Sequence, residues 1–279
     1  MFLLLSKIQI SKRRAVLYRI VLAFVFFCFL GVLFTAHAEY RIVSLAPNVT
    51  EILFEVGLGK QVVGVTDKCN YPAKAKNIAE IGSYYRPSIE KILMLEPTHV
   101  LGMREGYTKR LKYRLDKLGI RNRFFKVDDY HDISRMIAEI GEIFGKSTKN
   151  IRSRIDSYFN SGKIDYKGDV VFLISAKPAY AVGGGNFVND ILKCANLRNA
   201  LADSGKDFPR INYEKIFQLN PDYIILARRH GTSEADSFFY EKIKGLGEKA
   251  KILEVKPDIF LRPSYRIIDA CKMLKKLIR

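Results

Sequence analysis

The clearest pattern of apolar and polar positions lies near the middle of the chain, between positions 132 and 161. Its apolar residues recur at spacings of three, four and seven, and they are Ile133, Met136, Ile137, Ile140, Ile143, Phe144, Ile151, Ile155, Tyr158 and Phe159. That period places them on one stripe of an α-helix. Asp132 is positioned to cap this helix and Gly162 to end it, while Gly145 and Ser147 allow a bend or break. One helix of this length spans about 45 Å, which predicts a strut between two lobes, the alternative being an ordinary surface helix.

Before this segment, short apolar runs alternate with helical patterns. Buried strands are predicted at residues 41–45, 62–65, 98–102 and 123–127. Asn48 follows the first strand and, with Glu51 three residues later, forms the capping-box pattern that starts a helix. Strands that alternate with helices predict a parallel α/β sheet, in which ligands bind at the carboxyl ends of the strands.

After the segment, the same plan returns. Residues 170–175 have the pattern of a buried strand, and the stretch 211–226 aligns without a gap with the stretch 87–101. Both stretches share Glu-Lys-Ile, a leucine three residues later and a proline two residues beyond it. An internal repeat of this kind predicts two lobes of like topology.

Each repeat has an acidic residue in the first turn of its short helix, Glu90 in one and Glu214 in the other, after the caps Ser88 and Asn212. A favourable interaction with the helix dipole, worth about 0.3 to 1 kcal/mol, is one sufficient reason for an acid at this place. Its recurrence at the same place in both repeats favours a paired role.

The first 38 residues have the pattern of an export signal. Basic residues precede an apolar run at 20–35, and Ala36-His37-Ala38 matches a small-x-small cleavage site. We predict export to the periplasm with cleavage before Glu39. The alternative is an uncleaved membrane anchor, because the run approaches the roughly 18 residues of a spanning helix.

The exported part is about 240 residues long, more than one hydrophobic core usually holds. We therefore predict an α/β fold of two Rossmann-like lobes with parallel sheets, joined by a long inter-lobe α-helix, with a ligand crevice between the lobes. The predicted domains are a signal peptide at 1–38, an N-terminal lobe at 39–131, the inter-lobe helix at 132–163 and a C-terminal lobe at 164–279.

The exported part is strongly basic. Residues 1–38 hold five of the 47 Lys and Arg and none of the 29 Asp and Glu, which leaves 42 basic side chains against 29 acidic ones and a formal charge of +13. The basic residues are dispersed along predicted helices, without the motifs of a nucleic-acid-binding module. A basic exported protein beside an anionic membrane is the simpler interpretation.

Three cysteines remain in the exported part, and an oxidising compartment permits one bridge among them. We predict a disulfide between Cys194 and Cys271, both on predicted helices of the second half, which leaves Cys69 single. The sequence has no CxxC motif and no Cys/His cluster, so no metal site is predicted.

Several short motifs, taken together with the order of elements, resemble a known family. They are Ile42–Glu51 (IVSLAPNVTE), Val63–Asp67, Tyr71-Pro72, Ile89-Glu90, Leu95-x-Pro97, Leu118–Ile120, Phe208-Pro209, Glu214, Pro221-Asp222 and Phe260–Pro263. The pattern resembles the periplasmic substrate-binding proteins of ABC importers, in the class with a helical inter-lobe backbone that carries cobalamin, haem and ferric siderophores. The resemblance covers residues 39–279 and is nearest to the vitamin B12-binding branch, from which the chain departs in having no tryptophan.

The resemblance implies a monomer that binds a corrinoid and delivers it to an ABC permease dimer in the inner membrane, with no enzyme activity and no resident cofactor. Glu90 and Glu214 would engage arginines of the two permease subunits. A corrinoid is a broad disc with amide edges, which suits aromatic walls with a few polar groups. The ligand-binding residues that the resemblance implies are Pro47, Asn48, Tyr71, Tyr84, Tyr85, Met103, Arg104, Tyr180, Phe208, Asp258, Phe260 and Arg262.

Three alternatives stay open. A haem or ferric-siderophore ligand suits the basic residues Arg104, Arg228, Arg229 and Arg262 and an iron ligand such as His230 or a tyrosinate. A chelatase-like enzyme on the same scaffold is disfavoured, because the sequence has no nucleophile–base pair, phosphate loop or paired catalytic carboxylates. A membrane-tethered ligand sensor would require that residues 1–38 stay uncleaved.

Overall fold

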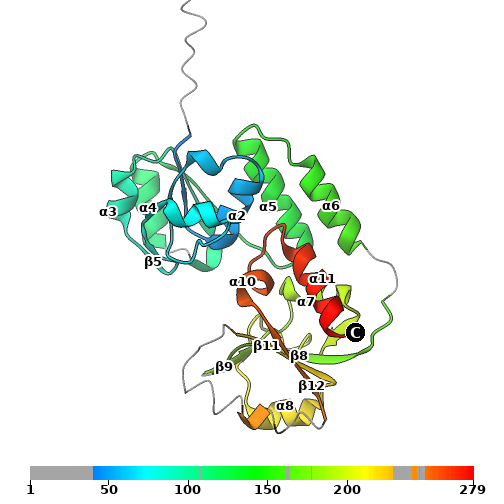
Figure 1. The fold of residues 1–279 in the computed structure, drawn as a ribbon. Helices are drawn as coiled ribbons and strands as arrows, with labels where there is room; N and C mark the ends of the chain where they lie inside the picture. Colours follow the sequence, from blue (N-terminus) through cyan, green and yellow to red (C-terminus); the bar gives the residue numbers. More distant parts are fainter. Residues whose placement is uncertain are drawn as a thin grey trace, which may run out of the picture. The chain divides into compact units, whose positions relative to one another are not determined.

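The computed structural model describes residues 40–106, 109–160, 164–176, 178–228, 241–243, 245 and 249–279. Residues Arg41–Arg279 belong to one compact unit (Figure 1). The predicted signal peptide, Arg229 and His230 lie outside the described residues. Within the described part, no helix is both long enough and apolar enough to span a bilayer.

The N-terminal half forms a parallel five-stranded sheet in the order β3-β2-β1-β6-β7. Its strands are β1 (Ile42–Ser44), β2 (Val62–Val65), β3 (Ala79–Glu80), β6 (His99–Met103) and β7 (Arg121–Phe125). Strand β1 lies in the middle, where all three of its residues are buried, and its Val43 is in register with Val100 of β6. The four strands predicted for this half are therefore present, with their parallel order.

Helices and short turns connect these strands. The helices are α2 (Pro47–Glu55), α3 (Ile89–Met94) and α4 (Lys109–Lys117), and the 3-10 turns are Gly59–Gln61, Ala73–Asn77 and Arg104–Gly106. Two short strands outside the sheet, β4 (Gly82–Ser83) and β5 (Arg86–Pro87), lie between β3 and α3. Ile92 of α3 and Leu115 of α4 are fully buried against Val43 and Val100. The apolar positions of the two helices thus close one side of the sheet.

The C-terminal half forms a second sheet in the order β10-β8-β11-β12, with β9 antiparallel on β8. The strands are β8 (Gly168–Ala176), β9 (Ala179–Ala181), β10 (Leu197–Asn199), β11 (Tyr223–Ala227) and β12 (Lys251–Val255). The described helices of this half are α7 (Val188–Cys194), α8 (Tyr213–Leu219), α10 (Pro257–Phe260) and α11 (Ile267–Leu277). The predicted fold of two lobes with parallel sheets is confirmed, while the domain boundaries stay a prediction.

The segment from 132 to 161 is not one continuous helix, and the chain breaks at Gly145, one of the two residues expected to allow a bend or break. The structure has two helices, α5 (Tyr130–Ile143) and α6 (Lys149–Phe159), which lie side by side in Figure 1. The rings of Tyr130 and Phe159 stack with their centroids 5.4 Å apart, so the start of α5 lies beside the end of α6. Gly145 adopts φ +63°, a left-handed conformation that ends a helix. The cap is also one turn earlier than predicted, because Asp129 accepts a hydrogen bond from the Asp132 N–H at 2.8 Å.

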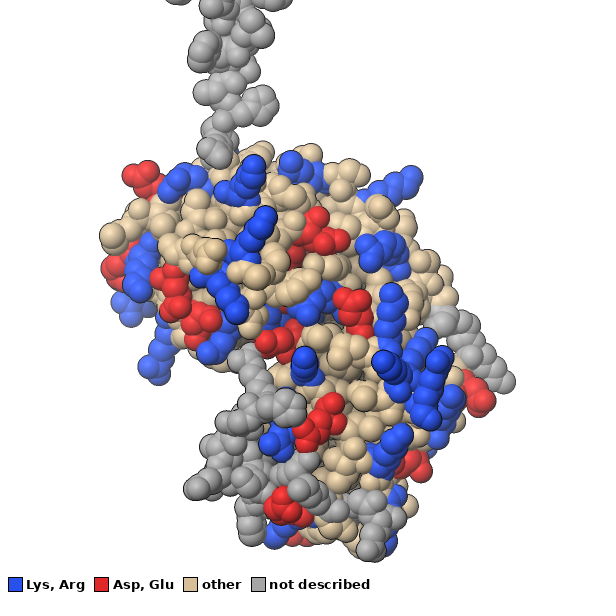
Figure 2. Space-filling view, in the orientation of Figure 1, with Lys and Arg blue, Asp and Glu red and all other residues tan. Residues whose placement is uncertain are grey.

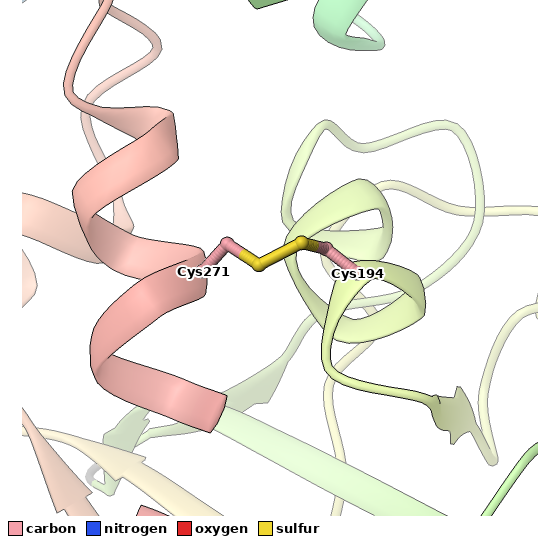
Figure 3. The surroundings of a disulfide bond; sticks show 2 residues. All are labelled: Cys194 and Cys271. Carbon is pink, nitrogen blue, oxygen red and sulfur yellow. A yellow bond between two sulfur atoms is a disulfide. The ribbon is translucent and has the colours of Figure 1, made fainter. Parts of the chain in front are cut away.

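The structure joins Cys194 of α7 and Cys271 of α11 by a disulfide, the pair expected from the sequence (Figure 3). The two Cα atoms lie 6.0 Å apart, and both cysteines are buried. Cys69 is a buried free thiol. The bridge fixes the C-terminal helix to the second lobe.

The internal repeat is present in three dimensions. The side chain of Ser88 accepts a hydrogen bond from the Lys91 N–H at 3.2 Å, and that of Asn212 accepts one from the Lys215 N–H at 2.9 Å. After each helix the chain turns through a left-handed residue at the same aligned position, Glu96 with φ 44° and Asn220 with φ 43°. Helices α3 and α8 therefore start and end in the same way.

Candidate functional site

One cavity of about 410 Å³ is lined by residues of both lobes. The first lobe contributes Pro47, Asn48, Lys68, Tyr84, Tyr85, Met103, Glu105, Val127 and Asp128. The second contributes Gly185, Asn186, Phe187, Asp207, Phe208, Pro257, Asp258, Leu261, Arg262 and Pro263. Many of these residues directly follow β1, β2, β6, β7 and β12, so the cavity lies at the carboxyl ends of the strands, where ligands of parallel sheets bind.

Eight of the twelve expected ligand residues line this cavity. They are Pro47, Asn48, Tyr84, Tyr85, Met103, Phe208, Asp258 and Arg262. Sequence reasoning missed Asn186 and Phe187, which follow the glycine loop of the second lobe, and Asp207. It also missed Val127 and Asp128, although their place at the end of a predicted strand and directly after it was a usable signal.

The other four expected residues do not line this cavity. Phe260 is fully buried, with its ring centroid 6.2 Å from that of Phe172, because its short helix turns it into the core. Arg104 is exposed in a 3-10 turn that directs the next residue to the cavity instead. Tyr180 lies in β9, and its backbone forms an isolated antiparallel β-bridge with that of Arg210. Tyr71 lines a neighbouring cavity.

Two tyrosines of the wall are carried by a tight hairpin. Strands β4 and β5 pair antiparallel with Tyr84 and Tyr85 at the turn, and the Ser83 hydroxyl accepts a hydrogen bond from the Arg86 N–H at 3.2 Å. Gly82 adopts φ +112°, and a Cβ there would lie 2.8 Å from the Arg86 carbonyl oxygen, so the hairpin requires glycine. The two rings meet edge to face at 4.8 Å, and Tyr85 is 72% exposed. The hairpin therefore presents aromatic surface to a ligand.

Asn48 does not cap α2 as predicted. The helix starts at Pro47 after the N-cap Ala46, without a side-chain cap. The Asn48 amide instead donates to the Pro263 carbonyl oxygen at 3.2 Å and lies 3.1 Å from the Met103 sulfur. Asn48 thus links the first lobe to the segment that follows α10.

Glu51, the other half of the predicted capping box, is fully buried and pairs with the C-terminal part of the chain. Its carboxylate accepts hydrogen bonds from Arg262 Nη1 at 3.0 Å, Arg266 Nη1 at 3.0 Å and the Ser264 hydroxyl at 2.6 Å. A buried carboxylate needs such partners, because an unpaired charge away from water is very costly. The capping-box prediction is therefore wrong, and Glu51 anchors the segment after α10 to the first lobe.

Arg262 lines the cavity, but its guanidinium is already engaged. Besides Glu51, it donates to the Asn70 side-chain oxygen at 2.8 Å and the Lys68 carbonyl oxygen at 3.0 Å, and it pairs with Asp258 at 3.0 Å. Two carboxylates thus compensate its charge. Arg262 holds the wall of the cavity together and is poorly placed to receive an anionic ligand.

The charged groups that line the cavity are predominantly acidic. Among the described lining residues, Glu105, Asp128, Asp207 and Asp258 are acidic, and Lys68 and Arg262 are basic. Asp258 pairs with Arg262, and Asp128 pairs with Lys126 beside the cavity. This balance is opposite to that of the whole chain, and on the face shown in Figure 2 Lys and Arg are spread over both lobes. The cavity therefore suits a neutral ligand that offers hydrogen-bond donors better than an anion.

A second cavity, of about 900 Å³, adjoins the first and shares Pro257 and Asp258 with it. Its lining includes Tyr71, whose ring lies 3.9 Å from the Arg266 guanidinium carbon, and the basic residues Lys76, Arg228, Lys256, Arg266 and Lys276. Its acidic residues are Glu254 and Asp258. This cavity is basic where the first is acidic.

A further polar contact between the two halves lies at the start of α5. The Tyr130 N–H donates to the Asp190 carboxylate of α7 at 2.8 Å. Burial raises the pKa of the Asp190 carboxyl above its ordinary value, partly offset by the hydrogen bond from Tyr130 and by Lys193. The carboxylate is thus desolvated where α5 meets the second lobe.

Glu90 and Glu214 lie outside both cavities, on the exposed faces of α3 and α8. The Glu90 side chain is 76% exposed, accepts a hydrogen bond from the Ser88 hydroxyl at 3.0 Å and lies 3.9 Å from Arg114. A hydrogen bond from its own backbone N–H, with that from Ser88, lowers the pKa of Glu90. The carboxylate is therefore ionised on the surface at neutral pH.

Comparison with known proteins identifies the family. The profile of the periplasmic binding protein family matches residues 42–246. The chain belongs to the periplasmic binding protein family. Among the described residues, no group of three or more His, Cys, Asp and Glu side chains could hold a metal ion.

Individual members of the family show the same similarity. A vitamin B12-binding protein of Vibrio campbellii is 24% identical over 239 residues, which cover 82% of this chain and 86% of that protein. The periplasmic heme-binding protein RhuT from Roseiflexus sp. RS-1 superposes with a TM-score of 0.74 at 22% identity, covering 86% of this chain and 98% of that one. The periplasmic vitamin B12 binding protein BtuF of Vibrio cholerae gives a TM-score of 0.66 at 20% identity, over 85% and 96% of the two chains. The structural likenesses support a two-lobed binding-protein fold.

Proposed function

We propose that this protein is the periplasmic substrate-binding component of an ABC importer, and that it binds cobalamin or a related corrinoid between its lobes. The charge balance of the 410 Å³ cavity carries the choice of ligand. Corrinoid amide groups can donate to Glu105, Asp128 and Asp207, and the corrin face can lie against Tyr85 and Phe208. The similarity to vitamin B12-binding proteins supports the same ligand class.

Delivery completes the proposed role. The exported protein works as a monomer in the periplasm after cleavage of residues 1–38, with the corrinoid as transported ligand and no resident cofactor or catalytic activity. Glu90 and Glu214 dock it on the two subunits of the permease in the inner membrane. One carboxylate on each lobe defines an axis and a register for docking, which suits the orienting role of exposed charges.

Calorimetry with cyanocobalamin tests the ligand. The protein starting at Glu39 should bind one cyanocobalamin per chain, and replacement of Phe208 by Ala should raise Kd about tenfold because one aromatic wall is lost. Tyr113→Ala removes a comparably exposed aromatic ring, 59% exposed, that lines neither of the two cavities, and it should leave Kd unchanged. Absence of binding heat would exclude a corrinoid.

Haem or an acidic ferric chelate is the second candidate, favoured by the basic 900 Å³ cavity with Tyr71. Propionates can pair with Lys76, Lys256 and Lys276, and a tyrosinate can ligate ferric iron. A Soret band that shifts when hemin is added, and that Tyr71→Phe abolishes, would establish this candidate. The same titration with Phe208→Ala separates the two cavities, because that variant affects only a ligand of the first.

A further inference from the structure

The two helices that carry the proposed docking carboxylates also expose apolar side chains. On α3, Leu93 is 37% exposed and Met94 is 82% exposed. On α8, Phe217 is 52% exposed. Leu93 and Phe217 occupy the same position in the aligned repeats, three residues after Glu90 and Glu214.

The repeat fixes these side chains on the same face as the carboxylates. Ile92 and Ile216, which precede them, are fully buried and set the rotation of each helix. Residues three apart lie on one face of a helix, so each lobe presents a carboxylate with an apolar side chain beside it. We call Glu90 with Leu93, and Glu214 with Phe217, the docking pairs.

Charge alone is a weak source of affinity at these places. Arg114 of this protein already lies 3.9 Å from the Glu90 carboxylate. The charge of Glu90 is therefore partly compensated before a cationic side chain of a partner approaches it. Exposed ion pairs contribute orientation more than binding energy. Side chains that become fully buried at the centre of an interface contribute most of it, and burial of apolar surface adds about 25 cal/mol per Å².

We propose that the docking pairs are one interaction surface for the permease, in which Leu93 and Phe217 supply affinity while Glu90 and Glu214 supply orientation. This inference rests on the proposed function. Because the two pairs are alike and lie on lobes of like topology, the matching partner has two like subunits, each with a cationic side chain beside an apolar hollow. Met94 enlarges the apolar surface of the first pair.

The test uses nanodiscs that carry an ABC permease of the source organism, chosen because the wild-type protein stimulates its ATPase activity. The variant L93S/F217S should raise the Kd for these nanodiscs at least about tenfold, both at 0.05 M and at about 1 M salt. The variant E90K/E214K should raise the Kd for the nanodiscs mainly at low salt, because about 1 M salt reduces the screening length to about 3 Å. The control Y166S removes an exposed ring, 44% exposed, from neither helix and should bind as the wild type does.

The outcomes separate the two proposals. If the wild-type protein stimulates no permease, the proposed function fails. If it stimulates one and L93S/F217S binds with unchanged Kd, or is weakened only at low salt, the apolar role is wrong while the function stands. Equal melting temperatures of variant and wild type exclude unfolding as the cause, and the single variant F217S repeats the test should the double variant not fold.

Discussion

Glu51 and Arg262 are 211 positions apart in the chain, and their side chains meet at 3.0 Å in the interior. The first belongs to a helix of the N-terminal lobe, and the second follows the last strand of the C-terminal lobe. With Arg266 and Ser264 they form a buried cluster that ties the end of the chain to the lobe at its beginning.

Replacement of Glu51 by Gln should therefore be strongly destabilising. It leaves two buried guanidinium groups without their shared carboxylate, and the removal of one partner from a buried ion pair costs about 3 to 5 kcal/mol. Urea unfolding followed by circular dichroism measures this loss. Asp116→Asn, which removes the exposed pair with Lys112, is the matched control and should leave the unfolding midpoint unchanged. A Glu51→Gln midpoint equal to that of the control would refute the prediction.

The burial of Asp190 should give stability an unusual dependence on pH. Burial raises the folded-state pKa of Asp190, so the folded protein holds this proton over a pH range in which the unfolded chain has lost it. The contribution of Asp190 to stability is thus greatest below the ordinary aspartate pKa, about 3.9, and is lost as pH rises through the folded-state pKa. Asp190→Asn, which keeps an oxygen acceptor for the Tyr130 N–H, should remove this loss.

Unfolding midpoints from pH 4 to pH 7 check the prediction for Asp190. The difference between Asp190→Asn and the wild type should grow in favour of the variant as pH rises. A constant difference across this range would show that Asp190 does not titrate there.

Loss of the disulfide between Cys194 and Cys271 should lower stability by about 2 to 4 kcal/mol, because the bridge closes a long loop, with a sequence separation of 77. Unfolding with and without dithiothreitol measures the effect. Cys69→Ala should respond to the reductant as the wild type does, because Cys69 is a free thiol whose pKa is raised by burial. The double variant C194A/C271A should be insensitive to reductant. Sensitivity that persists in that variant would contradict the assignment.

Gly141 of α5 should tolerate no side chain. A Cβ at this position would lie 2.6 Å from the Lys146 carbonyl oxygen and 2.6 Å from the Thr148 methyl carbon. Gly141→Ala should therefore destabilise by about 1 to 3 kcal/mol through overpacking, although alanine favours helices elsewhere. The neighbouring exposed Glu142→Ala is the control, and equal thermal stability of the two variants would exclude the clash.

The sheets and the internal repeat were predictable from sequence because their signals are local. Buried strands such as β6 read as short apolar runs, and the caps Ser88 and Asn212 lie within three residues of the groups they bind. The break between α5 and α6 was not predictable from periodicity, since the apolar spacing continues across the turn at Gly145.

The candidate site was only partly predictable for a related reason. Glu51 fits a capping box over four residues, but its partners lie more than 200 positions away, and no local pattern reports them. Phe260 follows strand β12, as a cavity residue would, and only its burial against Phe172 shows that it belongs to the core. Positions after strands indicate an edge of the sheet, while tertiary packing decides which of them face the cavity.

The turn between α5 and α6 has a consequence for how such proteins can vary in length. Because the chain reverses there, neither α5 nor α6 acts as a spacer whose residue count sets the distance between the lobes. Gly145, Lys146 and Ser147 are all exposed, so residues inserted at this tip would extend into solvent. Insertions and deletions among relatives can therefore accumulate at this place without any change in the span from Glu90 to Glu214.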